Sequence, residues 1–159
     1  MFTISDNLVL AVNKYFTWRA TAEMVNEKVG AIKTRVLLSG DFRTDKGERI
    51  TDYKQDYKLY SGNDAEAGGA VFTDYLQRLN IEYRLAGYNV SVAYCPALIA
   101  DSNARDAKRE FVGVFLADNP QLGVTIEKIL LMPIQYKKII ELVLTLVVNA
   151  DNFQTVKAV

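Results

Sequence analysis

The chain has 159 residues, half of them apolar, and its 19 basic and 19 acidic residues cancel to a formal net charge of zero. This length is enough for one well-packed core and short for two, and the balanced charge argues against a nonspecific nucleic-acid binder or a membrane-surface protein. With no histidine and only one cysteine, Cys95, the sequence disfavours histidine-dependent hydrolases and zinc sites, and it cannot form an internal disulfide.

The compartment is suggested by the segments that the sequence lacks. Residues 1–6 have neither the basic start nor the continuous apolar core of a signal peptide. The longest uncharged apolar run, 142–148, is far shorter than the roughly 20 residues that span a bilayer. We therefore expect a soluble protein without membrane contact, either cytoplasmic or assembled intracellularly into a particle.

The first predicted element is a helix from Ser5. Ser5 or Asp6 can cap it, and apolar residues then recur at three- and four-residue steps until the pattern fades near Gly30. This stripe consists of Leu8, Val9, Val12, Phe16, Ala20 and Met24. Trp18 lies off the stripe: a partly buried helix residue is the favoured interpretation, and contact with a second element or another subunit is the alternative.

A hairpin with a long loop is predicted next. Residues 31–40 alternate between two faces as a strand does, 41–48 has turn composition, and 49–60 makes a second, more polar strand. In this second strand Arg49, Tyr53 and Tyr57 share one face, which is the composition of a stacking platform for single-stranded nucleic acid.

Two aspartates argue against that platform. Asp52 and Asp56 would repel phosphates and cancel the charge of the neighbouring lysines, so an amphipathic strand with buried tyrosines is the favoured interpretation.

The central helix follows and runs to about Ala86, with Gly87 as its C-terminal stop in the left-handed conformation.

Four further strands are predicted, at 89–100, 111–117, 122–132 and 137–149. The last is the longest: Glu141, Thr145 and Asn149 share one face with Val143 and Val147, and the other face is an unbroken apolar row of Ile140, Leu142, Leu144, Leu146 and Val148. A helix competes, because Ile139, Leu142, Val143 and Leu146 also fit a period of 3.6. The β-branched content and the lack of a helix-start residue after Pro133 favour the strand.

The resulting fold prediction is a single α+β domain at 1–149, in which a mainly antiparallel sheet of about six strands is packed by the N-terminal and central helices. Residues 150–159 form a tail that is ordered only when docked. In the order of its elements the chain resembles the nuclear-transport-factor-2-like cone fold and also the ring-forming tail-terminator and connector proteins of tailed phages.

No motif for catalysis, cofactor binding or metal binding is found. The segment 41–48 superficially resembles a calcium loop, but Arg43 stands at a ligand position and the glycine is one place late. If the chain is an enzyme with a cone fold, Asp74, Tyr75 and Tyr94 are the candidate acid and base groups. An enzyme is nevertheless the less favoured reading.

We expect a non-enzymatic structural or assembly protein that forms homo-oligomers through sheet edges and its C-terminal strand and tail, with a phage-type virion or connector component as one concrete form. The interface candidates are Leu142, Leu144, Leu146, Val148, Phe153, Val156 and Trp18. The alternatives are a small-molecule-binding protein or enzyme of the cone type and, third, a single-stranded nucleic-acid binder. Other protein partners fit the first reading, whereas nucleic acid is disfavoured.

Overall fold

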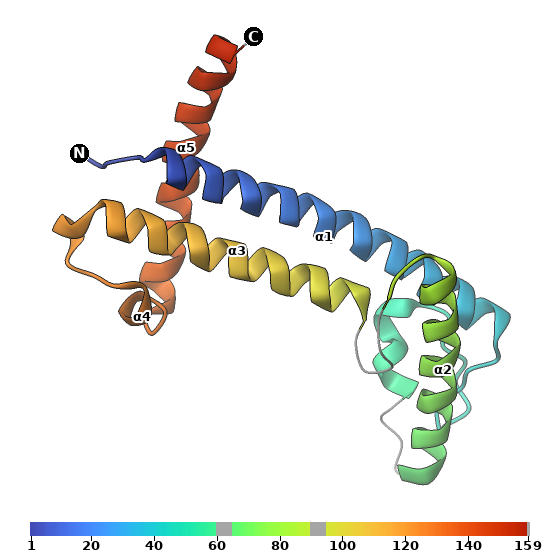
Figure 1. Cartoon of the computed structure of the whole chain (residues 1–159). Coiled ribbons are helices and arrows are strands. Elements are labelled where there is room, and N and C mark those ends of the chain that lie inside the picture. The colour runs from blue at the N-terminus through green and yellow to red at the C-terminus, as the bar shows by residue number, and fades with distance from the viewer. Residues whose placement is uncertain (60–64, 90–94, 159) are drawn as a thin grey trace. The chain divides into compact units, whose positions relative to one another are not determined.

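The computed structural model describes residues 1–59, 65–89 and 95–158, and the side chains of all of these except 65–68 and 150–158. Its elements are α1 (Asp6–Ser39), the 3-10 helix η1 (Tyr53–Leu59), α2 (Ala65–Leu85), α3 (Pro96–Asp118), the 3-10 helix η2 (Pro120–Leu122), α4 (Ile126–Ile129) and α5 (Pro133–Ala158) (Figure 1). The described residues form no β-strand, only an isolated antiparallel bridge between Arg43 and Arg49. The protein is helical, and the α+β prediction with a six-stranded sheet is wrong.

The helix α1 continues past Gly30, near which the three- and four-residue apolar pattern fades in the sequence. Its buried residues continue at steps of four and three through Val25, Val29, Ile32 and Val36, so 31–40 is helical and not a strand. Gly30 does not end the helix. A side chain at this position would meet the ring of Tyr53 at 3.0 Å, and glycine therefore allows the close approach.

The helices group into two compact units. Unit 1 contains Met1–Thr21 and Ala100–Val159, and unit 2 contains Ala22–Ile99. The expected division into one domain at 1–149 and a docking tail at 150–159 stays a prediction.

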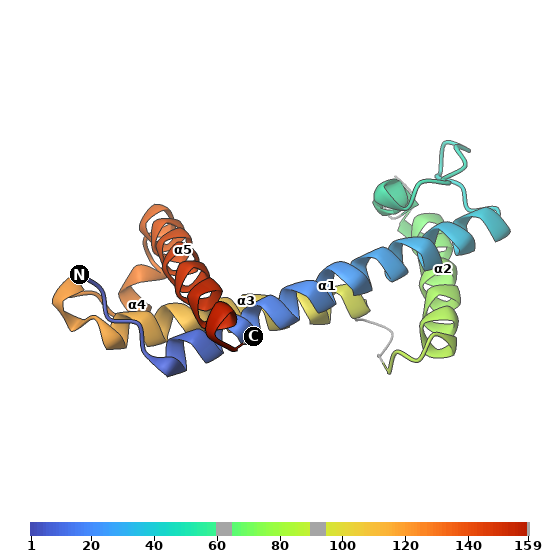
Figure 2. The ribbon, with the colours of Figure 1, turned by 90° about the horizontal axis from the view of Figure 1, so that it is seen from above.

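In unit 1, the first part of α1 runs antiparallel to α3, and α5 crosses both (Figures 1 and 2). The rings of Tyr15 and Phe111 meet edge to face with centroids 5.3 Å apart. Fully buried residues from all three helices complete this core, namely Leu8, Val12, Phe111, Val112, Phe115, Val143 and Val147.

The predicted strand at 137–149 is part of α5. Val143 and Val147 are fully buried one helical turn apart, although the strand reading placed them on the polar face with Glu141 and Thr145. Pro133 begins the helix, where its missing N–H costs nothing, so the helix start was present in the sequence as the proline itself.

The predicted strands at 111–117 and 122–132 are also wrong. Residues 111–117 lie in α3, where buried residues form the pairs 111–112 and 115–116 one turn apart. The second segment begins at the last residue of η2 and contains α4, and the side chain of Thr125 caps α4 by accepting a hydrogen bond from the backbone N–H of Lys128 at 3.4 Å.

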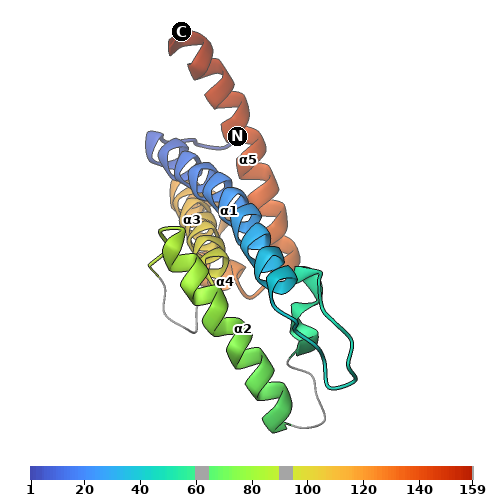
Figure 3. The same cartoon turned by 90° about the vertical axis from the view of Figure 1, so that its right-hand side faces the viewer.

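In unit 2, α1 is followed by a loop, then by η1 and then by α2 (Figure 3). Residues 53–59 form a 3-10 helix instead of the predicted strand at 49–60. Of the predicted strand at 89–100, residues 90–94 lie outside the described part and 96–100 begin α3.

The end of the central helix is as predicted. α2 ends at Leu85, Gly87 has a φ of 93°, and the backbone N–H of Tyr88 donates to the carbonyl of Tyr83 at 2.9 Å.

Among the described residues, no helix combines the length and the apolar character that a membrane span requires.

Candidate functional site

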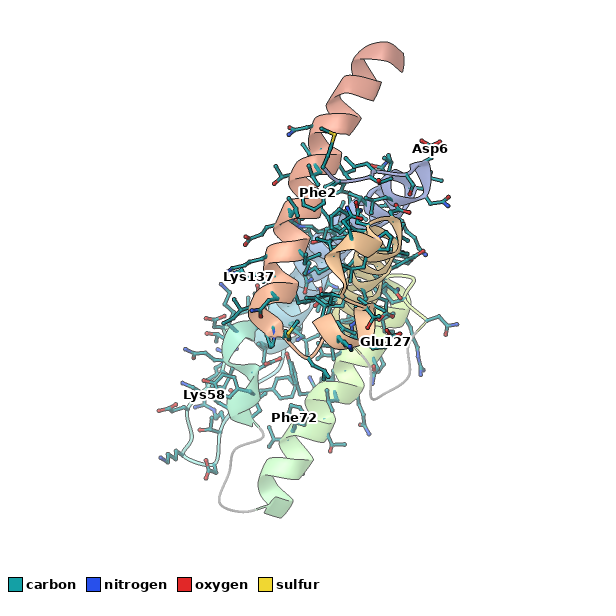
Figure 4. All side chains as sticks on the ribbon, turned by 90° about the vertical axis from the view of Figure 1, so that its left-hand side faces the viewer. Phe2, Asp6, Lys58, Phe72, Glu127 and Lys137 are labelled. Carbon is teal, nitrogen blue, oxygen red and sulfur yellow. The ribbon has the colours of Figure 1, made fainter. Side chains whose placement is uncertain are left out.

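Unit 2 contains a pocket of about 310 Å³, which we call the α2 pocket. Its walls come from α1, η1, α2 and the start of α3. They are mostly apolar or aromatic, with a few polar groups, and consist of Lys33, Asp56, Tyr57, Phe72, Tyr75, Leu76, Leu79, Asn80, Tyr83, Cys95 and Leu98. Figure 4 labels Phe72 of α2, which lines the pocket, and Lys58 of η1, which follows the lining residue Tyr57 in the chain. Such a lining is typical of a small-molecule site.

One end of the α2 pocket is a compact polar network. The hydroxyl of Tyr75 donates to a carboxylate oxygen of Asp56 at 3.0 Å, and the ammonium of Lys33 lies 3.5 Å from the same oxygen. Lys33 and Asp56 are both mostly buried. The ammonium and the carboxylate neutralise each other, so this end of the pocket has little net charge.

Two of the three tyrosines that line the pocket, Tyr75 and Tyr83, keep their phenol protons at neutral pH. Burial raises the pKa of Tyr75 above its usual value, and the neighbouring Asp56 carboxylate raises it further. Burial also raises the pKa of Tyr83, with an additional contribution from the thiol of Cys95, whose sulfur lies 3.8 Å from the hydroxyl. Neither tyrosine is therefore available as a base near neutral pH.

Asn80 is the most unusual residue of the α2 pocket. The residue is only 6% exposed, and its amide nitrogen Nδ2 has no hydrogen-bond partner among the described residues. Leaving a buried donor unsatisfied typically costs about 1–3 kcal/mol. A group that lines a pocket at this cost is well placed to donate to a ligand.

The candidate acid and base groups do not come together in the described structure. Tyr75 lines the α2 pocket, but Asp74 is exposed on the neighbouring face of α2 and pairs with Arg78 at 3.3 Å. Tyr94 lies outside the described residues.

The nucleic-acid candidates have different contacts. Tyr53 lies against Gly30, while Tyr57 lines the α2 pocket. The guanidinium of Arg49 donates to the carbonyl of Leu38 at 3.1 Å and lies 3.6 Å from Asp41. The three side chains thus have different local partners, and nucleic-acid binding by them stays a prediction.

Unit 1 has a second candidate site, an exposed apolar segment between α4 and α5. Leu130, Leu131, Met132 and Ile134 are all exposed, Leu131 by 82% and Ile134 by 68%. With Pro133 they form a continuous run that we call the 130–134 surface. Contiguous exposed apolar residues of this kind are typical of protein–protein contacts, whereas single ones are common on any surface.

Most of the interface candidates from the sequence pack within unit 1 instead of facing outward. Trp18, Leu142, Leu144 and Leu146 are partly buried against the unit 1 core. Val148 is 39% exposed. Phe153 and Val156 fall within α5, but their side chains lie outside the described part of the chain.

Asn80 and the 130–134 surface were both missed from the sequence, although each has a signal. Asn80 is a polar residue on the apolar stripe of α2, beside Leu76, Leu79 and Tyr83. The 130–134 surface belongs to a run of six apolar residues, but reading 122–132 as a buried strand concealed it.

The described side chains contain no group of three or more acidic, cysteine or histidine residues that is able to hold a metal ion. In the segment that superficially resembles a calcium loop, Asp41 pairs with Arg43 at 3.1 Å. Comparisons of the chain with family models, curated proteins and solved structures find no match.

Proposed function

We propose that this protein is a non-enzymatic structural or assembly protein that associates with further copies of itself through the 130–134 surface. The observation that carries the proposal is the exposure of Leu131 and Ile134 within one continuous apolar run. Burying apolar surface contributes roughly 25 cal/mol for each Å² removed from water, so covering this run favours association. The sheet edges that the sequence pattern predicts as contact surfaces are absent from the described residues.

The charges around the surface favour a second copy as the partner. Exposed Glu127 and Lys128 lie on its α4 side, and exposed Lys137 and Lys138 on its α5 side; Glu127 and Lys137 are labelled in Figure 4. Because both signs border the same patch, a two-fold contact can place Glu127 of one copy beside Lys137 of the other. The zero net charge of the chain adds no long-range repulsion between copies.

The resemblances to the cone fold and to phage ring proteins do not support this proposal. Both depended on an order of helices and strands that the described chain does not have. Self-association is therefore proposed from the exposed surface alone, without assigning the assembly to a particular particle.

The test is the solution mass, measured by light scattering after size exclusion at two concentrations. The wild type is expected to be an oligomer, and the double variant Leu131→Asp, Ile134→Asp is expected to be a monomer because each carboxylate would be buried in the contact. Leu85→Asp is the matched control: Leu85 is 77% exposed at the end of α2 in unit 2, and its replacement should leave the oligomer intact. A wild-type monomer at both concentrations contradicts the proposal.

The C-terminal part of α5 is proposed as a second contributor to the contact. A chain ending at Asn149 removes the candidates Phe153 and Val156, and we expect its oligomer to dissociate at higher concentrations than the wild type. The same light-scattering measurement over a dilution series checks this. An unchanged dissociation midpoint would remove 150–159 from the contact without affecting the 130–134 surface.

A further inference from the structure

We propose that the α2 pocket binds a small, neutral aromatic molecule that carries a carbonyl or a similar hydrogen-bond acceptor, and that Asn80 recognises this acceptor. The inference concerns unit 2 and does not depend on self-association through the 130–134 surface in unit 1.

The volume and walls of the pocket set the class of ligand. A volume of about 310 Å³ lies at the lower end of the roughly 300–1,000 Å³ range of small-molecule sites. Phe72, Tyr75 and Tyr83 contribute aromatic walls, and Leu76, Leu79 and Leu98 contribute aliphatic ones. Flat aromatic rings pack well between such side chains, so a compound of one or two fused rings is the expected occupant.

The hydrogen-bonding requirement comes from Asn80. Its Nδ2 group is a donor without a partner in the described structure, and the residue lines the pocket while being more than nine-tenths buried. A ligand that supplies an acceptor gains a hydrogen bond and also relieves the cost of the unsatisfied donor. A ligand of the same shape without an acceptor gains neither.

The charges in the pocket indicate a neutral ligand. Lys33 and Asp56 already neutralise each other, and Asp56 also accepts the hydroxyl of Tyr75. An anionic ligand would have to displace Asp56 from Lys33 and leave that carboxylate without its cation. A cationic ligand would meet the ammonium of Lys33.

Two probes of nearly equal shape isolate the acceptor. 2-Acetylnaphthalene carries a carbonyl where 2-isopropenylnaphthalene carries a methylene group. We expect the full-length protein to bind the ketone about tenfold more tightly than the alkene. Titrations followed by two-dimensional ¹H–¹⁵N NMR give both dissociation constants, and the side-chain amide signals of Asn80 should shift with the ketone only. Similar affinities for the two probes, or no binding of either, would overturn the proposal.

Asn80→Leu tests the recognition itself. This variant removes the unsatisfied amide while keeping a side chain of similar size, so the preference for the ketone should disappear while both probes still bind. A tenfold preference that survives in Asn80→Leu would show that another group holds the acceptor, and it would refute the role of Asn80.

A second pair of variants tests the location without touching the buried network. Leu98 is 57% exposed and lines the pocket, so Leu98→Trp should block its entrance and reduce binding of both probes at least tenfold. Ile99→Trp is the matched control, because Ile99 is also exposed but does not line the pocket. The thiol of Cys95 provides a second readout: the ketone should slow its reaction with a thiol reagent in the wild type and in Ile99→Trp, but not in Leu98→Trp. Undiminished binding by Leu98→Trp contradicts the assigned site.

Discussion

Two buried asparagines, one in each unit, have opposite environments. In unit 1 the Asn119 carbonyl accepts from the backbone N–H of Thr3 at 2.6 Å and from Gln121 at 3.2 Å, and its amide donates to the carbonyls of Thr3 and Phe115, both at 2.9 Å. In unit 2 the amide nitrogen Nδ2 of Asn80 has no hydrogen-bond partner within the described structure. The same residue type thus joins the N-terminal segment to the end of α3 in one unit and lines a pocket in the other. Hydrogen-bond saturation, more than burial, separates a structural polar group from a binding group.

The largest effects are expected from truncating the cores. Phe111→Ala leaves a void in the closed core of unit 1 and should lower the free energy of unfolding by about 3–5 kcal/mol. Leu79→Ala should cost about 2–3 kcal/mol, at the low end for such changes, because Leu79 already borders the α2 pocket. Urea denaturation can be followed separately in the two units, by the fluorescence of the single tryptophan, Trp18, in unit 1 and by the exposure of Cys95 in unit 2. Equal losses of unfolding free energy in Phe111→Ala and Leu79→Ala would contradict the difference between the closed core of unit 1 and the core of unit 2, which borders the α2 pocket.

The substitution Asn119→Leu is expected to have the next largest effect on stability. It leaves the buried carbonyl of Phe115 and the part-buried hydrogen-bonding groups of Thr3 without their Asn119 partner, so the free energy of unfolding should fall by about 2–3 kcal/mol. Urea denaturation followed by Trp18 fluorescence measures the change. A loss below about 0.5 kcal/mol would show that the four hydrogen bonds of Asn119 do not stabilise unit 1.

Alkaline pH should destabilise unit 2 through Tyr75 and Tyr83. Their pKa values are raised in the folded protein, so above the unfolded-state value of about 10 the unfolded chain loses protons that the folded chain retains. The stabilisation is complete below that pH, and above it stability falls by up to about 1.4 kcal/mol per pH unit for each phenol.

The control for this pH effect is the double variant Tyr75→Phe, Tyr83→Phe. Burial also raises the pKa of Tyr136 in unit 1, so the contribution of the α2 pocket is the difference in slope between wild type and variant. Unfolding midpoints in urea at a series of pH values from 8 to 11 provide the slopes. Parallel curves would mean that the two phenols ionise as readily in the folded state as in the unfolded one.

The smallest effect is expected to have the opposite sign. Asn80→Leu removes an unsatisfied donor, so it should leave the free energy of unfolding unchanged or raise it by about 1 kcal/mol. Compared with the loss in Asn119→Leu, this sharpens the contrast between the two asparagines. A destabilisation by Asn80→Leu as large as that by Asn119→Leu would place the two residues in the same class.

Some helix boundaries followed directly from local chemistry in the sequence. Ser5 does cap α1, since its hydroxyl oxygen accepts from the backbone N–H of Leu8 at 3.1 Å, and Gly87 does terminate α2. The strands were mispredicted where the apolar residues fit both the strand period of 2 and the helical period of 3.6. In α5 the β-branched content was given more weight than the helical spacing of Ile139, Leu142, Val143 and Leu146, although strand propensity is a weak preference that packing overrides.

The candidate sites depend on contacts between distant segments, which single-sequence periodicity does not contain. The α2 pocket combines Lys33 of α1, Asp56 of η1 and Leu98 of α3 with residues of α2. Tyr75 could be selected from the sequence as a candidate polar group, but its partner Asp56 lies 19 residues away, in a segment assigned to a strand. Asn80 was detectable only as a polar residue on an apolar helix face.

The division of the chain also sets an order for its synthesis on the ribosome. Unit 2 is one continuous stretch, so all its residues have been made once Ile99 has been added. Unit 1 is interrupted by unit 2, and Leu8 and Val12 must wait for Val143 and Val147 before their core can close. At the usual elongation rate of roughly 5–20 residues per second, the apolar face at the start of α1 stays without its final partners for about 7 to 26 seconds. The core of unit 1 therefore closes only after every residue of unit 2 has been made.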